Sequence, residues 1–230
     1  MQLLVSVANA DEAAAAAAGG ADVVDAKDPT RGALGAVTPA AFARIRSAVT
    51  TPTSAAIGDA EDDESVERDA RAFRNAGALF VKVGFGGTSD VARLARILEA
   101  ARRGAPGALV AVAYADAERA GAATPAAVLD AAAHAGATGI LLDTADKTGP
   151  GVRRLMTAPA LADWVRAARD ARLRVAIAGQ LTAADLSFVR DLGADIAGVR
   201  GAACIGGRMG RISSRLVRAL RDEAQGLALA

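Results

Sequence analysis

Residues 18–27 read AGGADVVDAK, which is a glycine pair, a short apolar run and then two charged residues among the last three. The glycines follow an alanine-rich stretch of helical composition, and a helix commonly stops at such a left-handed residue. The phrase recurs in varied form as NAGALFVK at 75–82, HAGATGILLD at 134–143 and DLGADIAGV at 191–199. Each copy predicts a step from a helix to a strand, so the chain consists of repeated strand–helix units.

Eight apolar runs of this kind follow one another, and most are continuously apolar, as strands covered on both faces of a parallel sheet are. They predict strands at 3–7, 22–26, 53–57, 79–83, 109–113, 139–143, 174–178 and 195–199. The Ala-, Arg- and Glu-rich segments between them predict helices at 10–18, 38–48, 63–76, 89–103, 125–135, 158–171, 182–192 and 210–224. Helix-starting residues are expected at Asp11, Thr38, Thr124 and Thr182.

Eight such units in 230 residues favour an α/β fold, namely a (β/α)8 TIM barrel that forms a single domain over residues 1–230. A doubly wound open sheet is the alternative. It more often has about five to seven strands and a glycine-rich loop after the first strand. The first strand here runs into VANAD at 7–11, which is no such loop.

The amino-acid composition limits the possible core residues, binding partners and cellular location of the protein. Hydrophobic residues make up 52% of the chain but aromatic residues only 3%, so Val, Leu, Ile and Ala must build the core. The net charge of +1 gives no reason to expect nucleic acid or a membrane surface as partner. The one cysteine excludes an intrachain disulfide and favours the cytoplasm. The first residues do not resemble a signal peptide, and no apolar stretch approaches the roughly 20 residues of a transmembrane helix.

Lysine is rare in this chain. Only Lys27, Lys82 and Lys147 occur among 27 basic residues, and the other 24 are arginine. Each lysine lies at or just after the C-terminal end of a predicted strand, which is the end of a barrel that carries the active site. A lysine amine can lose its proton and attack a carbonyl, whereas a guanidinium stays protonated. The three positions therefore indicate amine chemistry at one site, with stray lysines left by an arginine bias as the alternative.

Two aspartates accompany the lysines. Asp25 and Lys27 are two residues apart, so on an extended strand they point to the same face. Asp143 ends the sixth predicted strand, four residues before Lys147. Lys82 has no obvious partner nearby in the sequence. A plain ion pair or an ordinary loop charge is the alternative for these residues.

A second ammonium nearby and partial burial would lower a lysine pKa from about 10.4 to about 8. The neutral amine could then form a Schiff base with a ketone or aldehyde, and a neighbouring base could take the α-proton to give an enamine. We therefore predict a catalytic set of Lys27, Lys82, Asp25, Asp143 and Lys147. The two aspartates would relay protons and hold the ammonium groups.

The loops after the last two strands predict a phosphate site. They contain AGQ at 178–180 and RGAAC at 200–204. Barrels commonly bind phosphate in these loops through backbone N–H groups and a helix N-terminus. We expect phosphate to be bound by Gly179, Gln180, Arg200, Gly201 and Ala202, with the two glycines permitting close backbone approach and the arginine adding charge. Loop flexibility is the alternative explanation of the glycines.

Other candidates are weaker. His134 is expected on a helix surface, whereas Cys204 and Trp164 are expected to pack. Tyr114 and Asp116 follow the fifth strand, and the sequence favours neither a place on the pocket lining nor a place away from it. No group has metal-ligand spacing, so we expect no metal and no cofactor. The oligomeric state stays open, although alanine-rich helix faces are compatible with a homo-oligomer.

At these residues the chain resembles the (5-formylfuran-3-yl)methyl phosphate synthase family, also called 4-(hydroxymethyl)-2-furancarboxaldehyde-phosphate synthase, of methanofuran biosynthesis. The resemblance covers residues 1 to about 212. It is carried by LLVSV at 3–7, GGADVVDAKDPTRGALGA at 19–36, SAAIGD at 54–59, VKVGFGG at 81–87, AYADAERAGA at 113–122, LLDTADKTG at 141–149, AIAGQL at 176–181, GVRGAAC at 198–204 and GRI at 210–212.

The resemblance implies a (β/α)8 fold and a reaction that joins two molecules of glyceraldehyde 3-phosphate. One molecule is first isomerised toward dihydroxyacetone phosphate, and aldol-type joining, loss of one phosphate and two dehydrations follow. It also implies that Lys27 forms the Schiff base and that Lys82 is the proton acceptor. Asp25, Asp143 and Lys147 fall at positions that assist.

The chain departs from the family pattern after Gly58-Asp59. Archaeal members continue with a V-P-x-K-P-G-like segment, whereas AEDDE at 60–64 is acidic and lysine-free. No role in holding the second phosphate is therefore carried over to this loop. Two other functions stay open, namely a Schiff-base (class I) aldolase or triose-phosphate isomerase on the same barrel, and a non-catalytic barrel subunit.

Overall fold

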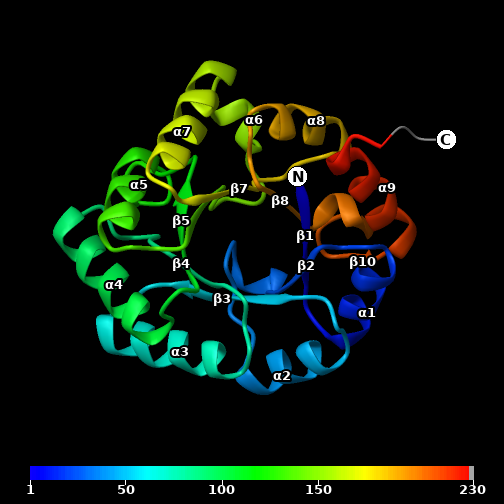
Figure 1. Ribbon diagram of the computed structural model, residues 1–230, viewed down its shortest axis with the longest axis horizontal. Coiled ribbons are helices and arrows are strands. Elements are labelled where there is room, and N and C mark those ends of the chain that lie inside the picture. The colour runs from blue at the N-terminus through cyan, green and yellow to red at the C-terminus, as the bar shows by residue number, and fades with distance from the viewer. Residues whose placement is uncertain (228–230) are drawn as a thin grey trace.

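The computed structural model describes residues 1–227, which fold into a closed barrel of eight parallel strands surrounded by helices (Figure 1). The strands are β1 Gln2–Val7, β2 Val23–Ala26, β3 Thr53–Asp59, β4 Val81–Gly84, β5 Leu109–Tyr114, β6 Gly139–Asp143, β7 Arg174–Ile177 and β8 Ile196–Val199. The long outer helices are α1 Ala10–Ala18, α2 Pro39–Ser47, α3 Asp63–Asn75, α4 Val91–Gly104, α5 Pro125–His134, α7 Ala158–Asp170, α8 Ala183–Asp191 and α9 Ser214–Gln225. The (β/α)8 fold predicted from the sequence is confirmed.

The strands follow one another around the barrel in sequence order, and β8 pairs with β1 to close it. Every pairing is parallel, so all eight strands end at the same rim of the barrel. The loops that follow the strands are therefore gathered at that rim. The three lysines, which the sequence places at strand ends, therefore lie around one opening of the barrel.

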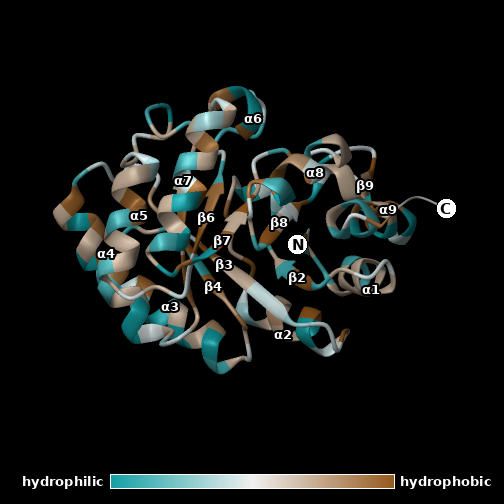
Figure 2. Cartoon of the chain, turned by 45° about the horizontal axis from the view of Figure 1, so that its top comes forward, coloured by the Kyte–Doolittle hydropathy of each residue, from teal (hydrophilic) through white to brown (hydrophobic). Residues whose placement is uncertain are grey.

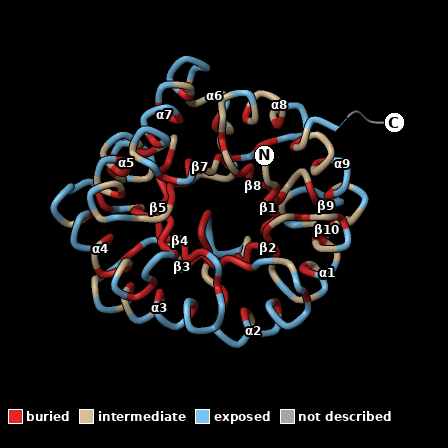
Figure 3. Tube along the Cα trace, viewed as in Figure 1, coloured by how far each residue is buried: buried red, intermediate tan, exposed pale blue. Residues whose placement is uncertain are grey.

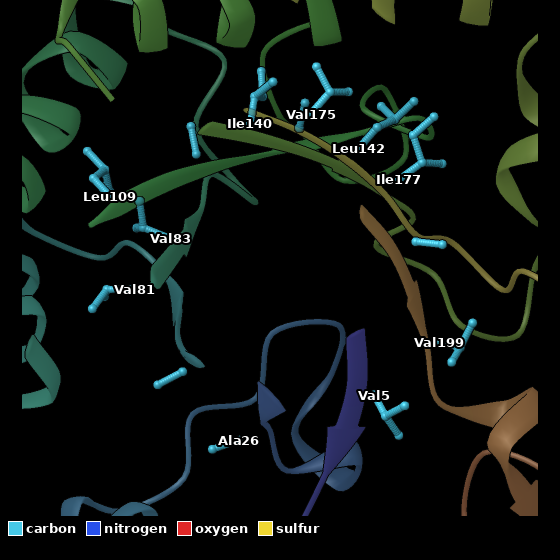
Figure 4. Packing of buried hydrophobic residues seen from close by; sticks show 14 of the residues in the cluster. Val5, Ala26, Val81, Val83, Leu109, Ile140, Leu142, Val175, Ile177 and Val199 are labelled. Atoms are coloured by element: carbon cyan, nitrogen blue, oxygen red, sulfur yellow. The ribbon is translucent and has the colours of Figure 1, made fainter. Parts of the chain in front are cut away.

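Most of the core lies between the strands and the helices. The outward-pointing side chains of the strands form a layer of branched aliphatic residues there, including Val5, Val81, Val83, Ile140 and Ile177, each with 0% exposure (Figure 4). Buried residues lie along the strands and on the inner sides of the helices, while residues on the outer helix faces are exposed (Figure 3). Hydropathy follows the same division, with hydrophilic residues on the outer faces (Figure 2).

The helix starts follow simple local chemistry. Thr38 and Thr124 cap α2 and α5 by accepting the N–H of Ala41 and Ala127 at 3.2 Å, and a proline follows each threonine. The prediction that Asp11 caps the first helix is wrong. Asn9 does so by accepting the N–H of Glu12 at 3.0 Å.

Five short elements were not predicted from the sequence, and two of them are the 3₁₀ helices η1 Pro29–Arg31 and η2 Gly201–Ala203. A one-turn helix, α6 Val152–Leu155, follows the β6 loop. A two-stranded hairpin of β9 Cys204–Ile205 and β10 Arg211–Ile212 follows β8. The helix predicted at 210–224 therefore begins only at Ser214, because residues 211 and 212 pair back onto 204 and 205. Within residues 1–227, no helix has both the length and the apolar composition needed to cross a membrane.

Candidate functional site

A cavity of about 440 Å³ occupies the barrel. Its deeper wall is apolar and consists of inward-pointing side chains from several strands, among them Leu4, Phe80, Val110, Leu141, Ala176 and Ile196. Its wall at the strand ends is polar and charged. All ten residues that the sequence predicts for catalysis and phosphate binding lie on this lining: Asp25, Lys27, Lys82, Asp143, Lys147, Gly179, Gln180, Arg200, Gly201 and Ala202.

Asp25 is the most enclosed of the charged residues, with 0% exposure. Its Oδ1 forms an ion pair with Lys82 Nζ and accepts the hydroxyl of Ser54 at 2.8 Å. Its Oδ2 accepts the hydroxyl of Ser6 at 3.1 Å. The parallel register explains this arrangement, because Ser6 is the pairing partner of Asp25 on β1 and Ser54 is its partner on β3. The carboxylate is thus held on both sides of its strand, and it places the Lys82 ammonium in the cavity wall.

A second pair lies at the end of β6. Asp143 Oδ1 accepts Lys147 Nζ at 2.5 Å and the backbone N–H of Thr144 at 2.8 Å. Its Oδ2 is buried and has no hydrogen-bond partner among the described residues. Burial raises the pKa of Asp143, but Lys147 and Lys27 outweigh it and hold this pKa below its usual range. Asp143 is therefore an ionised carboxylate on the cavity lining, with one buried oxygen that has no hydrogen-bond partner in the described part of the chain.

Lys27 differs from the other two lysines. Within residues 1–227 no carboxylate oxygen lies within ion-pairing distance of its Nζ, although the residue is only 6% exposed. Burial lowers the pKa of Lys27 to about 7. Asp143 and Asp25 oppose this change, and Lys147 and Lys82 add to it. A large fraction of this amine is therefore neutral near pH 7, mainly because of burial rather than because of the neighbouring ammonium groups.

The loops after β7 and β8 bring backbone groups to the same cavity. Gly179 and Gln180 both adopt left-handed conformations, with φ of +89° and +60°. A side chain at Gly179 would also crowd Val152 and Thr144, at 3.0 and 3.1 Å. Gly201 begins a short 3₁₀ helix, η2 Gly201–Ala203, and the N–H groups of Gly201 and Ala202 have no backbone acceptor among the described residues.

The expected helix N-terminus is already occupied. Thr182 and Asp185 form a capping box at the start of α8, in which Asp185 accepts the Thr182 N–H at 2.9 Å. This carboxylate places negative charge where the sequence analysis expected room for a phosphate.

Arg200 also has other partners than expected. Its Nη1 donates to Glu12 at 2.8 Å and to the Ser6 carbonyl at 3.0 Å, and its Nε donates to the Arg208 carbonyl at 2.9 Å. The residue is 6% exposed. Its charge is thus compensated by Glu12, and the guanidinium joins β8 to β1, α1 and the hairpin.

Sequence reasoning missed Ser6, Ser54 and Arg208, which also line the cavity. The two serines could have been found only from the strand register, whereas Arg208 lies in a glycine-rich turn that carries no periodic signal. Tyr114 and Asp116 are not on the lining. Tyr114 donates its hydroxyl to Asp59 at 2.7 Å within the core, and Asp116 accepts the N–H groups of residues 145 and 146.

The remaining candidates have ordinary surroundings. His134 is exposed on α5, Cys204 is buried, and the Trp164 indole donates to the Pro125 carbonyl at 3.1 Å. In the described part of the chain, no three His, Cys, Asp or Glu residues form a group that could hold a metal ion.

The arrangement is suited to carbonyl chemistry. It contains a buried amine with a pKa near neutrality, a carboxylate oxygen without a partner, and two ammonium groups held by aspartates. Groups of these kinds can act as a nucleophile for a carbonyl carbon, as a base, and as cations that stabilise developing negative charge.

Comparison with known proteins gives consistent results. The family model described as 4-HFC-P synthase matches residues 3–221. The (5-formylfuran-3-yl)methyl phosphate synthase of Methanothermobacter thermautotrophicus is 38% identical over 96% of this chain and 98% of its own length. The enzyme of the same name from Methanopyrus kandleri is 37% identical over 96% and 98%. The resemblance found in the sequence is thus confirmed.

The fold is shared much more widely. The crystal structure of phosphoribosyl anthranilate isomerase from Thermus thermophilus superposes with a TM-score of 0.66 over 99% of this chain and all of that one. Their sequence identity is 17%. This similarity supports the barrel and carries no information about the reaction.

Proposed function

The chain belongs to the 4-HFC-P synthase family, and we propose that it condenses two molecules of glyceraldehyde 3-phosphate to (5-formylfuran-3-yl)methyl phosphate through a Schiff base on Lys27. The two trioses together contain the atoms of the product, one phosphate and two waters. The conversion therefore needs no oxidant or reductant, only carbon–carbon bond formation, ring closure, eliminations and proton transfers. Such a reaction is a carbon–oxygen lyase and synthase reaction.

The observation that carries the proposal is the state of Lys27. Its neutral amine adds to the carbonyl carbon of a triose phosphate, and the carbinolamine then loses water to give a protonated imine. Because that imine withdraws electrons, the neighbouring C–H becomes acidic. Removal of this proton gives an enamine, whose carbon joins the second triose in an aldol-type step after one triose has been isomerised toward dihydroxyacetone phosphate. Loss of one phosphate, ring closure and loss of two waters then give the furan. A buried amine that stayed fully protonated at pH 7 could not begin this sequence.

We assign proton transfer to the two aspartate–lysine pairs. The unpartnered Oδ2 of Asp143 serves as the base, and Asp143 is close enough to Lys27 to oppose the lowering of its pKa. Lys82 can accept a proton only after it has given one away. We therefore assign it first as the donor to the departing carbinolamine oxygen and afterwards as the acceptor. Lys147 holds Asp143 ionised, and Asp25 holds Lys82 in place.

The test is incubation of the purified protein with glyceraldehyde 3-phosphate. Near-ultraviolet absorbance of the furan aldehyde should appear together with released phosphate. Borohydride added during turnover should attach the substrate to Lys27, and Lys27→Arg should lose both the label and the absorbance. Formation of a hexose bisphosphate without a furan would favour a Schiff-base aldolase. Full activity of Lys27→Arg would overturn the imine mechanism.

A further inference from the structure

The β9–β10 hairpin places an arginine at the opening of the cavity. Arg208 lies in the turn between the two short strands, is half-buried and lines the cavity. Its Nη2 donates to the carbonyl of Gly32 at 2.9 Å. Gly32 belongs to the loop that follows Lys27, so this side chain spans from the end of the barrel to the loop after β2.

Arg208 has no carboxylate partner among the described residues, unlike the other basic side chains at this end of the cavity apart from Lys27. Lys82 is paired with Asp25, Lys147 with Asp143, and Arg200 with Glu12. No carboxylate oxygen within the described residues lies within 4.0 Å of the Arg208 guanidinium. Burial lowers the pKa of Arg208, and Asp143 counteracts this change only from a distance. A partly desolvated cation without a counter-charge favours an anionic ligand.

The charges at this end of the cavity lead to the same conclusion. Once Lys27 is neutral, the three ion pairs cancel in net charge. Among the cavity-lining residues at the strand ends, the remaining positive charge is that of Arg208, because Arg174, which also lines the cavity without a carboxylate partner within residues 1–227, begins β7 at the opposite end of the barrel. A phosphate dianion that enters the cavity therefore meets uncompensated charge at this side chain, whereas the guanidinium of Arg200 is already satisfied by Glu12.

Backbone donors lie beside the same residue. A side chain built on Gly201 would come within 3.7 Å of the Arg208 backbone nitrogen, so the hairpin turn packs directly against the start of η2. The N–H groups of Gly201 and Ala202, which have no backbone acceptor, are thus next to the segment that carries the guanidinium. Arg200 stabilises this placement of the hairpin turn, because its Nε donates a hydrogen bond to the Arg208 carbonyl.

We propose that Arg208 binds the phosphate group of the triose whose carbonyl reacts with Lys27, together with the N–H groups of Gly201 and Ala202. Arg200 is the positioning residue that holds the hairpin. This inference rests on the proposed function for the identity of the substrate. It makes Arg208 the residue that selects phosphorylated over unphosphorylated aldehydes.

The experiment compares Arg208→Gln and Arg208→Lys with Arg211→Gln, which removes an exposed arginine from the same hairpin. Loss of a charge-assisted hydrogen bond should raise the KM for glyceraldehyde 3-phosphate about ten- to a hundredfold in Arg208→Gln. The lysine variant should recover part of this loss, and Arg211→Gln should match the wild type. Borohydride trapping of unphosphorylated glyceraldehyde on Lys27 should be equal in all four proteins.

A second measurement does not depend on turnover. Inorganic phosphate should raise the unfolding temperature of the wild type and of Arg211→Gln, but not that of Arg208→Gln. The inference is overturned if phosphate protects all variants equally. It is also overturned if Arg208→Gln loses trapping of the phosphorylated and unphosphorylated aldehydes to the same extent, which would indicate a purely structural tie to Gly32. Failure of the wild type to make any furan would overturn the proposed function, and the phosphate measurement would still decide the role of Arg208.

Discussion

Lys82 and Asp25 form an ion pair inside the barrel, with side chains that are 4% and 0% exposed. The two residues come from β4 and β2, and β3 lies between their strands. Ser6 and Ser54 satisfy the remaining capacity of the carboxylate. The charge of Lys82 in the cavity wall therefore depends on a carboxylate that has no contact with solvent.

Asp25→Asn should destabilise the protein by about 3–5 kcal/mol, because it leaves the Lys82 ammonium buried without a counter-charge. The free energy of unfolding in urea measures this effect. Asp163→Asn, which removes an exposed partner of Arg166, should change it by less than about 1 kcal/mol. The double variant Asp25→Asn with Lys82→Met should recover much of the loss. Equal losses in the single and the double variant would contradict the assignment to unpaired charge.

Imine formation should depend on pH in a way that reports the Lys27 amine. The rate of borohydride trapping should rise as the pH passes through about 7, where Lys27 loses its proton. Lys147→Met removes a cation that lowers this pKa and frees Asp143, which raises it, so the rise should move to higher pH. Arg154→Gln, on the exposed surface of α6, should leave the midpoint unchanged. A midpoint that stays fixed in Lys147→Met would contradict the electrostatic coupling.

The buried amine of Lys27 should also lower the free energy of unfolding at and below neutral pH. Lys27 has a pKa of about 7 in the folded protein and about 10.5 in the unfolded chain, so the unfolded chain binds more protons between these values. The stability contributed by this group therefore increases with pH from about 7 to 10.5. Lys27→Met should be more stable than the wild type by up to a few kcal/mol at and below pH 7. This difference should shrink toward zero near pH 10.5, and urea unfolding across this pH range measures it. A difference independent of pH would show that the effect comes from packing alone.

Glu12→Gln should destabilise the closure of the barrel. It removes the charge opposite Arg200, whose side chain is 4% exposed, and we expect a loss of about 3 kcal/mol. Glu99→Gln provides the control, since its pair with Arg102 is half exposed and should contribute less than about 1 kcal/mol. Urea unfolding of both variants gives the comparison, and similar small losses would mean that Arg200 is held by its backbone acceptors instead.

The barrel could be predicted because its signals are local. Continuous apolar runs, helix-stopping glycines such as Gly136, and threonine caps such as Thr124 each depend on a few neighbouring residues. The strand-end lysines could be found for the same reason. Once parallel strands are inferred, all their C-terminal ends must lie at one rim.

The partners within the site could not be predicted from local patterns. The Lys82–Asp25 pair and the serine hydroxyls on Asp25 depend on strand register, which the sequence does not give for inward-facing polar residues. Arg200 pairs with Glu12, which lies 188 residues earlier in the sequence, so no local pattern indicates this ion pair. The sequence analysis therefore assigned the charge of Arg200 to phosphate binding. The hairpin turn was missed because glycines at 206, 207 and 210 break every periodic pattern.

Burial of Lys27 in the closed barrel also makes the reactive amine a product of folding. In the unfolded chain, Lys27 is exposed to water and its amine is almost entirely protonated at neutral pH. In the folded barrel, burial lowers the pKa of the same amine to about 7. Conditions that unfold the barrel should therefore remove the nucleophile together with the cavity, even though no bond in Lys27 changes.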